Sequence, residues 1–268
     1  METNGKLHRN SRELLTSSTM PSADFDVDKT LGALLVGTLV SYTLFGLASS
    51  QAYTYFGRFP DDSRRMKAMV GAVWLAEFVH TICIAISIYT MVITNYGHPG
   101  LPVRLPSSLI TSTVIGSTVA YFVQSFFAYR IYALSRSLWI PCICWTLSLF
   151  RLIPPNVVML AYGIHQPIPE FLSDWGWLFD SVWAVSSAND ILIAASMSVL
   201  LYRRRTEGLK HTAAVMDKMI KWTIETGVVT SITSIVMMAA FLSMRNNFIW
   251  MAIFIVIPRL FSNSLFAR

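Results

Sequence analysis

The stretch FIWMAIFIVIPRLFSNSLFAR (Phe248–Arg268) decides whether the chain has six or seven helices that could cross a lipid bilayer. Its first ten residues are apolar, but Pro258, Arg259 and Asn263 follow directly. Arg259 and Asn263 are four residues apart and therefore share one face of a helix. A charge at membrane depth is costly and normally faces the interior with a partner. We therefore interpret this stretch as a seventh membrane helix whose polar face points inward, toward the acidic residues of the second and fifth helices.

The composition of the whole chain agrees with a membrane protein. The chain has 268 residues, of which 54% are apolar and only 13% are charged, and its mean hydropathy is +0.51. Soluble domains carry about 25% charged residues. The formal net charge of +6 does not indicate nucleic acid binding, because the basic residues lie in short loops between apolar segments. The sequence predicts one integral membrane domain whose partner is the lipid bilayer.

Seven apolar segments follow a polar stretch, residues 1–30, in which we expect a flexible tail without a cleavable signal peptide. Each segment is close to or longer than the roughly 20 residues that span a bilayer core as a helix. Helices satisfy their own backbone hydrogen bonds in lipid. The prediction is an all-α, seven-transmembrane helix bundle over residues 31–268, with helices at 31–56, 66–95, 105–133, 138–162, 176–202, 219–243 and 248–267.

The distribution of Lys and Arg predicts the orientation of this bundle. Twelve lie in or beside the first, third and fifth loops, whereas the second, fourth and sixth loops hold only Arg104 and Arg245. Short loops rich in Lys and Arg face the cytoplasm. The prediction is an amino terminus outside and a carboxy terminus in the cytoplasm, with the plasma membrane favoured over internal membranes.

Polar residues inside the predicted helices are the candidates for an intramembrane site, either structural or ligand-binding. Glu77 and His80 share a helix face, and Glu-x-x-His is half of a di-iron motif. The chain has no second Glu-x-x-His, so we expect a hydrogen-bonded pair that orients the second helix. The full predicted cluster is Glu77, His80, Gln124, Arg151, Asp190, Glu225, Arg259 and Asn263.

Asp190 is the embedded carboxylate that we most expect to be ionised and paired, with Arg259 and Arg151 as candidate partners. A buried ion pair that fixes helix order and a contact to a ligand or ion both remain open. In the third helix, small or polar residues recur every four positions, which predicts close packing and a central place in the bundle. These residues are Ser108, Ser112, Gly116, Ala120, Gln124 and Ala128. In the fourth helix, Pro154 and Pro155 predict a kink or a break.

The sequence offers no set of catalytic residues, cofactor ligands or metal ligands. His80 is the only clearly embedded histidine, and no Gly-x-Ser-x-Gly elbow occurs. The last helix has no lysine, which excludes a retinal Schiff base there. Cys142 and Cys144 have no histidine nearby in the sequence. We therefore expect no enzyme, no cofactor and no metal site.

Several stretches resemble one family, the large fungal (basidiomycete) family of seven-helix membrane proteins whose C-terminal half is a domain of unknown function. The most specific is Ser-Asn-Ser-Leu in the last helix, residues 262–265. The others are TLGALLVGTLVSYTLFG (30–46), QAYTYFGRFPDD (51–62), WLAEFVHT (74–81), VITNYG (92–97) and VQSFFAYRIYALS (123–135). The resemblance implies the seven-helix fold and a fungal membrane, but no known activity. The chain departs from the family at Glu225, where the family usually has an asparagine.

Two functions fit these features. The first is a receptor-like sensor that binds a small ligand and acts on a cytoplasmic signalling partner, which the seven helices and the basic inner loops favour. The second is a transporter or channel that uses the intramembrane polar cluster, and Glu77, Asp190, Arg151 and Arg259 would form its relay. An open path lined by Glu77, Asp190 and Arg259 would favour transport, whereas a closed interior with an outward pocket would favour sensing.

Overall fold

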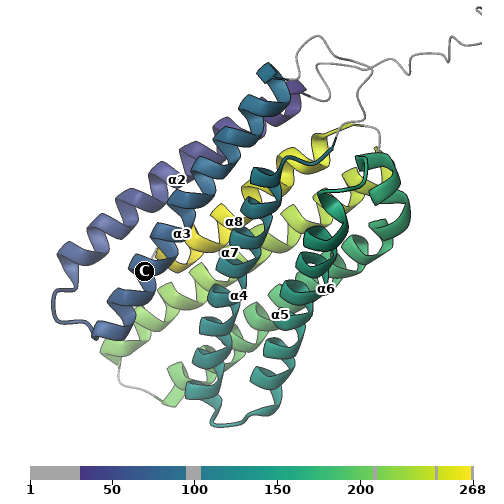
Figure 1. The fold of residues 1–268 in the computed structure, drawn as a ribbon. Coiled ribbons are helices and arrows are strands. Elements are labelled where there is room, and N and C mark those ends of the chain that lie inside the picture. Colours follow the sequence, from purple (N-terminus) through teal and green to yellow (C-terminus); the bar gives the residue numbers. More distant parts are fainter. Residues whose placement is uncertain (1–30, 95–103, 208–209, 245–246, 267–268) are drawn as a thin grey trace, which may run out of the picture.

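The computed structural model describes residues 31–94, 104–207, 210–244 and 247–266, which form long helices joined by short connections (Figure 1). The predicted tail, residues 1–30, lies outside the described residues. The helices are α2 (Ala33–Arg58), α3 (Arg64–Tyr89), α4 (Ser107–Ser135), α5 (Trp139–Val158), α6 (Ile168–Glu207), α7 (Lys210–Ser243) and α8 (Ile249–Phe266), with single π-helical turns η2 (Thr90–Thr94) after α3 and η3 (Met159–Gly163) after α5. The all-α prediction is confirmed.

Local chemistry explains where some of these helices begin and end. The Ser63 hydroxyl accepts a hydrogen bond from the Met66 amide at 3.4 Å and so caps the start of α3. Helix α4 ends at Ser135 and is capped by Arg136, whose φ of 57° is left-handed and whose amide donates to the Tyr132 carbonyl at 2.8 Å. This tight reversal leads directly into α5.

The seven long helices form a closed ring in which each contacts its neighbours in sequence and α8 contacts α2. Helix α4 also contacts α6 and α8, and α3 also contacts α8. Consecutive helices run in opposite directions, so α2, α4, α6 and α8 all begin at one end of the bundle (Figure 1). We call this the amino-terminal end, and the opposite one, where α8 finishes, the carboxy-terminal end.

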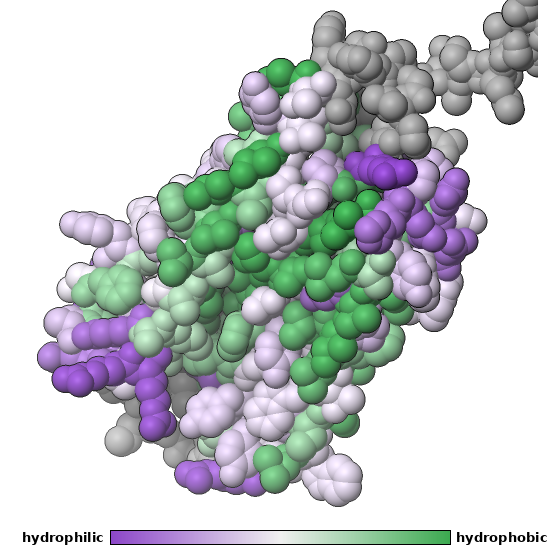
Figure 2. Space-filling view, in the orientation of Figure 1, coloured by the Kyte–Doolittle hydropathy of each residue, from purple (hydrophilic) through white to green (hydrophobic). Residues whose placement is uncertain are grey.

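The surface of the bundle suits a bilayer. Seven helices among the described residues are long and apolar enough to cross a membrane. Large apolar side chains such as Leu39, Leu75 and Ile191 point outward and are more than half exposed. Figure 2 shows apolar residues in a band across the visible face and hydrophilic residues gathered at the two ends. The chain is therefore a multi-pass membrane protein, and its seventh helix, α8, is part of the bundle.

The stripe of small residues on α4 faces the interior. Ser112, Gly116, Ala120, Gln124 and Ala128 are all buried, as expected for a central helix. A methyl group added at Gly116 would lie 2.7 Å from Cγ of Pro258 on α8, so the absence of a side chain there permits the close approach of the two helices.

Helix α5 continues through its two prolines, and α6 begins earlier than the sequence predicted. Pro154 and Pro155 lie inside α5, which does not break at them but passes into the π-helical turn η3 after Val158. Prolines are tolerated in membrane helices where neighbouring groups and local π-helical turns satisfy the freed backbone groups. Helix α6 begins eight residues before the predicted 176, because a helix need not end where its apolar run ends.

Candidate functional site

The first group of buried polar side chains surrounds Arg259, and we call it the Arg259 cluster. Arg259 is fully buried and forms an ion pair with Glu77, which is also fully buried. Its Nη1 donates to the Glu77 carbonyl at 2.9 Å, its Nη2 to Thr81 Oγ1 at 2.8 Å and its Nε to Ser41 Oγ at 3.1 Å. The guanidinium also lies 5.1 Å from the ring centre of Phe45. One arginine on α8 thus joins α2 and α3.

Asn263 extends this junction by one helical turn. Its Nδ2 donates to the Leu44 carbonyl on α2 at 3.1 Å and to the Arg259 carbonyl at 2.8 Å. The two residues share one face of α8, and that face points at α2 and α3. The sequence predicted the shared inward face but directed it toward the acids of both α3 and α6.

Of the two candidate partners of Asp190, Arg259 is excluded, and the expected hydrogen bond between Glu77 and His80 is not formed. The partner of Arg259 is Glu77 and not Asp190, because α8 packs beside α2 and α3 at this depth. Glu77 forms no hydrogen bond with His80, although both residues are described and buried. Instead, His80 faces Gly116 on α4, where its Nε2 would lie 3.4 Å from an added methyl group.

The second polar group joins α4, α5 and α6, and we call it the Asp190 network. Gln124 Nε2 donates to Asp190 Oδ1 at 2.8 Å, and Ser148 Oγ donates to Gln124 Oε1 at 3.0 Å. Asn189 Nδ2 donates to Ser148 Oγ at 3.0 Å. All four side chains are buried. Because Gln124 both donates and accepts within this network, it is the link between the acid and α5.

Arg151 on α5 lies near the Asp190 network without a salt bridge to it. Its guanidinium is 4.6 Å from the ring centre of Phe261 on α8, which is a cation–π geometry. Arg151 and Asp190 are close enough to attract each other electrostatically. No hydrogen bond joins Arg151 to any residue that the structure describes, and its Nη1 is buried and unpartnered. The Phe261 side chain is itself buried.

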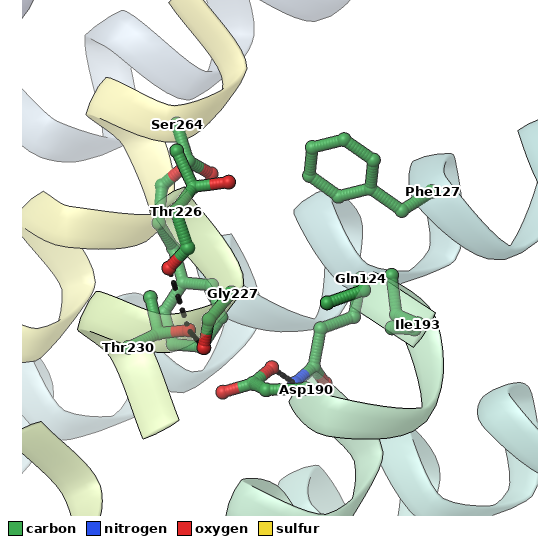
Figure 3. Close-up of a pocket in the computed structure, with 10 residues that line it drawn as sticks. Gln124, Phe127, Asp190, Ile193, Thr226, Gly227, Thr230 and Ser264 are labelled. Carbon is green, nitrogen blue, oxygen red and sulfur yellow. Dashed lines mark hydrogen bonds between the residues drawn. The ribbon is translucent and has the colours of Figure 1, made fainter. Parts of the chain in front are cut away.

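Asp190 also lines a cavity on the side of α7, which we call the Asp190 cavity. Figure 3 shows Gln124 and Phe127 from α4, Asp190 and Ile193 from α6, and residues of α7 and α8 around it. The cavity has a volume of about 30 Å³, counted as space that the centre of a water molecule can reach. Its polar wall is Asp190, whose Oδ2 has no partner among the described residues, with Thr226, Thr230 and Ser264 opposite.

Two further cavities lie toward the amino-terminal end. The polar cavity, of about 50 Å³, is lined by Arg151, Asn156, Ser186 and His80 among others. The aromatic cavity, of about 40 Å³, lies nearer the helix ends and is lined mainly by Phe171, Phe179, Trp183, Phe241, Trp250 and Phe254. The two cavities share wall residues, Thr113, Phe179, Trp183 and Phe254, and are therefore neighbours.

Glu225 lies outside the interior, contrary to the sequence prediction. Its side chain is 58% exposed on α7 and lies 3.8 Å from Lys221 Nζ, one turn earlier. In the sequence of α7, Lys218 and Lys221 precede Glu225 by about two turns and one turn, so Glu225 stands in the polar part of this helix. The predicted interior cluster therefore loses this residue, and the remaining seven divide between the two polar groups and the polar cavity.

This difference predicts the outcome of two substitutions. Gln124→Met is expected to destabilise the protein by about 1–3 kcal/mol, because Asp190 Oδ1 and the Ser148 hydroxyl lose a buried partner. Glu225→Gln is expected to change stability by at most about 0.5 kcal/mol, because exposed i,i+4 pairs contribute little. Thermal unfolding of the two variants in one detergent measures both. Equal losses would contradict the placement of Glu225 outside the interior.

The described residues contain no group of three or more His, Cys, Asp or Glu side chains placed to hold a metal ion. Cys83, Cys142 and Cys144 are free thiols, and Cys142 is exposed whereas Cys144 is buried. The Cys-x-Cys pair thus points in two directions. The predictions of no metal, no cofactor and no catalytic residue stay predictions.

Sequence reasoning missed several residues of these sites. Ser41, Thr81, Ser148 and Asn156 hold the interior together, yet single hydroxyl and amide side chains are common in membrane helices and give no distinctive pattern. Trp250 lies near the start of α8, a position where tryptophans usually anchor a helix at the headgroup level. It is buried, and it lines the aromatic cavity. Only the arrangement of the helices distinguishes such an inward ring from an outward one.

Comparisons with known proteins identify a part of the chain. No curated protein and no solved structure matches the chain. The matched part runs from α6 to the last residue and contains Asp190, Arg259 and Asn263, but not Glu77. Over residues 186–268 the chain matches the model of a family of unknown function, DUF6534.

Proposed function

We propose that this multi-pass membrane protein is a receptor-like sensor that binds a small ligand inside the helix bundle. The observation that carries the proposal is the contact of Arg151 with Phe261. Arg151 lines the polar cavity, whereas Phe261 lines the Asp190 cavity nearer the carboxy-terminal end. A ligand that draws the guanidinium into the polar cavity would change a contact between α5 and α8.

The separation of the two polar groups also supports sensing. The Arg259 cluster is fully buried, and none of the cavities described above is lined by Glu77, Asp190 and Arg259 together. Glu77 and Arg259 neutralise each other's charge, and α8 packs against α2, α3, α4 and α7. This group suits a rigid frame, and the mobile part of the proposed mechanism is the pair Arg151 and Phe261.

In this proposal the amino-terminal end faces outside, the carboxy-terminal end faces the cytoplasm, and the membrane is the plasma membrane. The support comes from the basic residues in and beside the connections α2–α3, α4–α5 and α6–α7, because these connections lie at the carboxy-terminal end. A cytoplasmic signalling partner would meet the bundle there. The side chains of residues 204–220 lie outside the described residues, so the partner's contact surface is not defined further.

A transporter is the second candidate, and one observation favours it. The aromatic cavity, the polar cavity and the Asp190 cavity follow one another along the bundle, and the Phe261 ring lies at the last boundary. If this ring moved aside, the three cavities would form a path. Proteins that transport solutes often place charged residues along such a path.

The decisive experiment compares signalling with flux in the intact protein. We expect a ligand-dependent signal in cells, read as activation of a heterotrimeric G protein, and no uptake of labelled organic acids, sugars or amino acids into proteoliposomes that contain only this chain. Phe261→Ala should weaken the signal, whereas Leu75→Ala, a change in a side chain that points outward from α3, should not. Solute uptake without any partner would contradict the sensor and favour the transporter.

A further inference from the structure

Arg151 gives the polar cavity an unusual electrostatic character. A guanidinium carries five N–H donors and stays charged. In the described part of the chain, Arg151 has a ring contact with Phe261 and an electrostatic attraction to Asp190, but no hydrogen-bond acceptor. Unpaired donors in a low-dielectric interior are costly. The cavity therefore presents a cation whose donors are free to bind an anionic group.

Neighbouring side chains place further unpartnered polar atoms on the same cavity. Asn156 Nδ2 donates to Ser117 Oγ and to the Leu152 carbonyl, both at 2.7 Å, which fixes the amide and leaves Oδ1 unpartnered. Ser186 Oγ is also unpartnered. Both side chains are more than nine-tenths buried. Ser186 can donate to an oxygen held by Arg151, while Asn156 Oδ1 can accept from a hydroxyl or amide.

The aromatic cavity provides a place for an apolar body attached to such a head group. Trp183, Phe241 and Trp250 form an edge-to-face cluster, with ring centres 5.0 Å apart for Trp183 and Phe241 and 5.2 Å apart for Phe241 and Trp250. Phe179 lies 6.1 Å from Trp183 on the side shared with the polar cavity. Flat rings pack favourably against such a cluster.

The volumes of the cavities limit the ligand to a small molecule. The aromatic cavity has a volume of about 40 Å³ and the polar cavity one of about 50 Å³, both counted as space that the centre of a water molecule can reach. On the same measure, one water molecule needs roughly 10–15 Å³. Together they match a compact molecule with one ring or a short chain. A sterol or a full-length fatty acid is too large for them.

We propose that the ligand is a small carboxylic acid with a flat or short apolar body. Its carboxylate accepts from Arg151 and Ser186 in the polar cavity, and its body lies among the rings of the aromatic cavity. This inference rests on the proposed function, since it names the ligand class of the same site. A neutral alcohol would lose the charge-assisted hydrogen bond, and an amine would be repelled by Arg151.

The test uses the full chain in nanodiscs and compares acids with alcohols of matching shape. Phenylacetate and hexanoate are expected to raise the unfolding temperature saturably and to change the fluorescence of the tryptophans. 2-Phenylethanol and 1-hexanol are expected to bind more weakly by roughly tenfold or more, the difference that one charge-assisted hydrogen bond makes. Arg151→Gln should remove this preference, and Glu225→Gln should keep it.

Two outcomes overturn the ligand class: equal binding of acids and alcohols, or no saturable effect of any probe. If Arg151→Gln does not fold, the comparison of acids with alcohols in the unmodified protein still decides. Different results would contradict the proposed function. Uptake of phenylacetate into proteoliposomes would exclude the sensor while supporting the ligand class, whereas a signal triggered by a neutral or cationic ligand would support the sensor and exclude the acid.

Discussion

Replacement of Arg259 by leucine is expected to remove most of the folded protein from membranes. The change leaves the buried Glu77 carboxylate without its cation and removes the donor to Ser41 Oγ and Thr81 Oγ1, while the Glu77 carbonyl still accepts from Thr81 Oγ1. Loss of one partner of a buried ion pair costs about 3–5 kcal/mol. That is a large part of the stability of a typical domain. The measurement is the yield of monodisperse protein after extraction, followed by thermal unfolding of what remains.

A double substitution provides the matched control. Glu77→Leu combined with Arg259→Leu removes both charges, so it is expected to be more stable than Arg259→Leu alone. Asp190→Asn should have a smaller effect than Arg259→Leu, because asparagine still offers an acceptor to Gln124. If the double variant is destabilised by the sum of the effects of Glu77→Leu alone and Arg259→Leu alone, Glu77 and Arg259 are not coupled.

The second large effect is expected at Gly37, where α2 and α8 come closest. A methyl group added at Gly37 would lie 2.7 Å from the Ala252 carbonyl oxygen and 2.8 Å from its Cα, and backbone atoms cannot rotate away. Gly37→Ala should therefore force the helices apart, at a cost of about 1–3 kcal/mol for overpacking. Thermal unfolding in detergent should show a clear decrease in midpoint.

Gly46 provides a control within the same helix. Nothing lies within 4 Å of a methyl group added there. Gly46→Ala is expected to leave stability unchanged or to raise it by up to about 1 kcal/mol, because alanine favours the helix. If both substitutions lower the midpoint equally, the close contact between α2 and α8 does not carry the effect.

The fold was largely predictable because membrane helices must be long, apolar and internally hydrogen-bonded. The seven segments follow from that requirement alone. The residues at which the helices begin and end were less predictable. In α6, the residues before Trp175 include Glu170 and Asp174. These charged side chains lower the local hydropathy, so the predicted apolar segment begins after them although the backbone is already helical. Pro154 and Pro155 were expected to kink or break α5, and the helix continues through them because a proline removes a backbone donor without preventing the helix that follows.

The pairing of the charges was not predictable, and the reason is geometric. Periodicity shows that Arg259 and Asn263 share a face, but it does not show which helices that face meets. The contact of α8 with α3 decides that Glu77 is the partner. Glu225 was misplaced because the sequence of α7 does not show at which residue the buried part of this helix begins. The aromatic cavity was missed because inward and outward tryptophans look alike in sequence.

The junction of α8 with α2 and α3 has a consequence for biosynthesis. Glu77 is synthesised 182 residues before Arg259. Until Arg259 arrives, the carboxylate must remain protonated or in contact with water. The first three helices therefore cannot reach their final arrangement during translation. Chains that stop before Arg259 would keep this unpaired acid, a feature by which membrane quality control can select them for degradation.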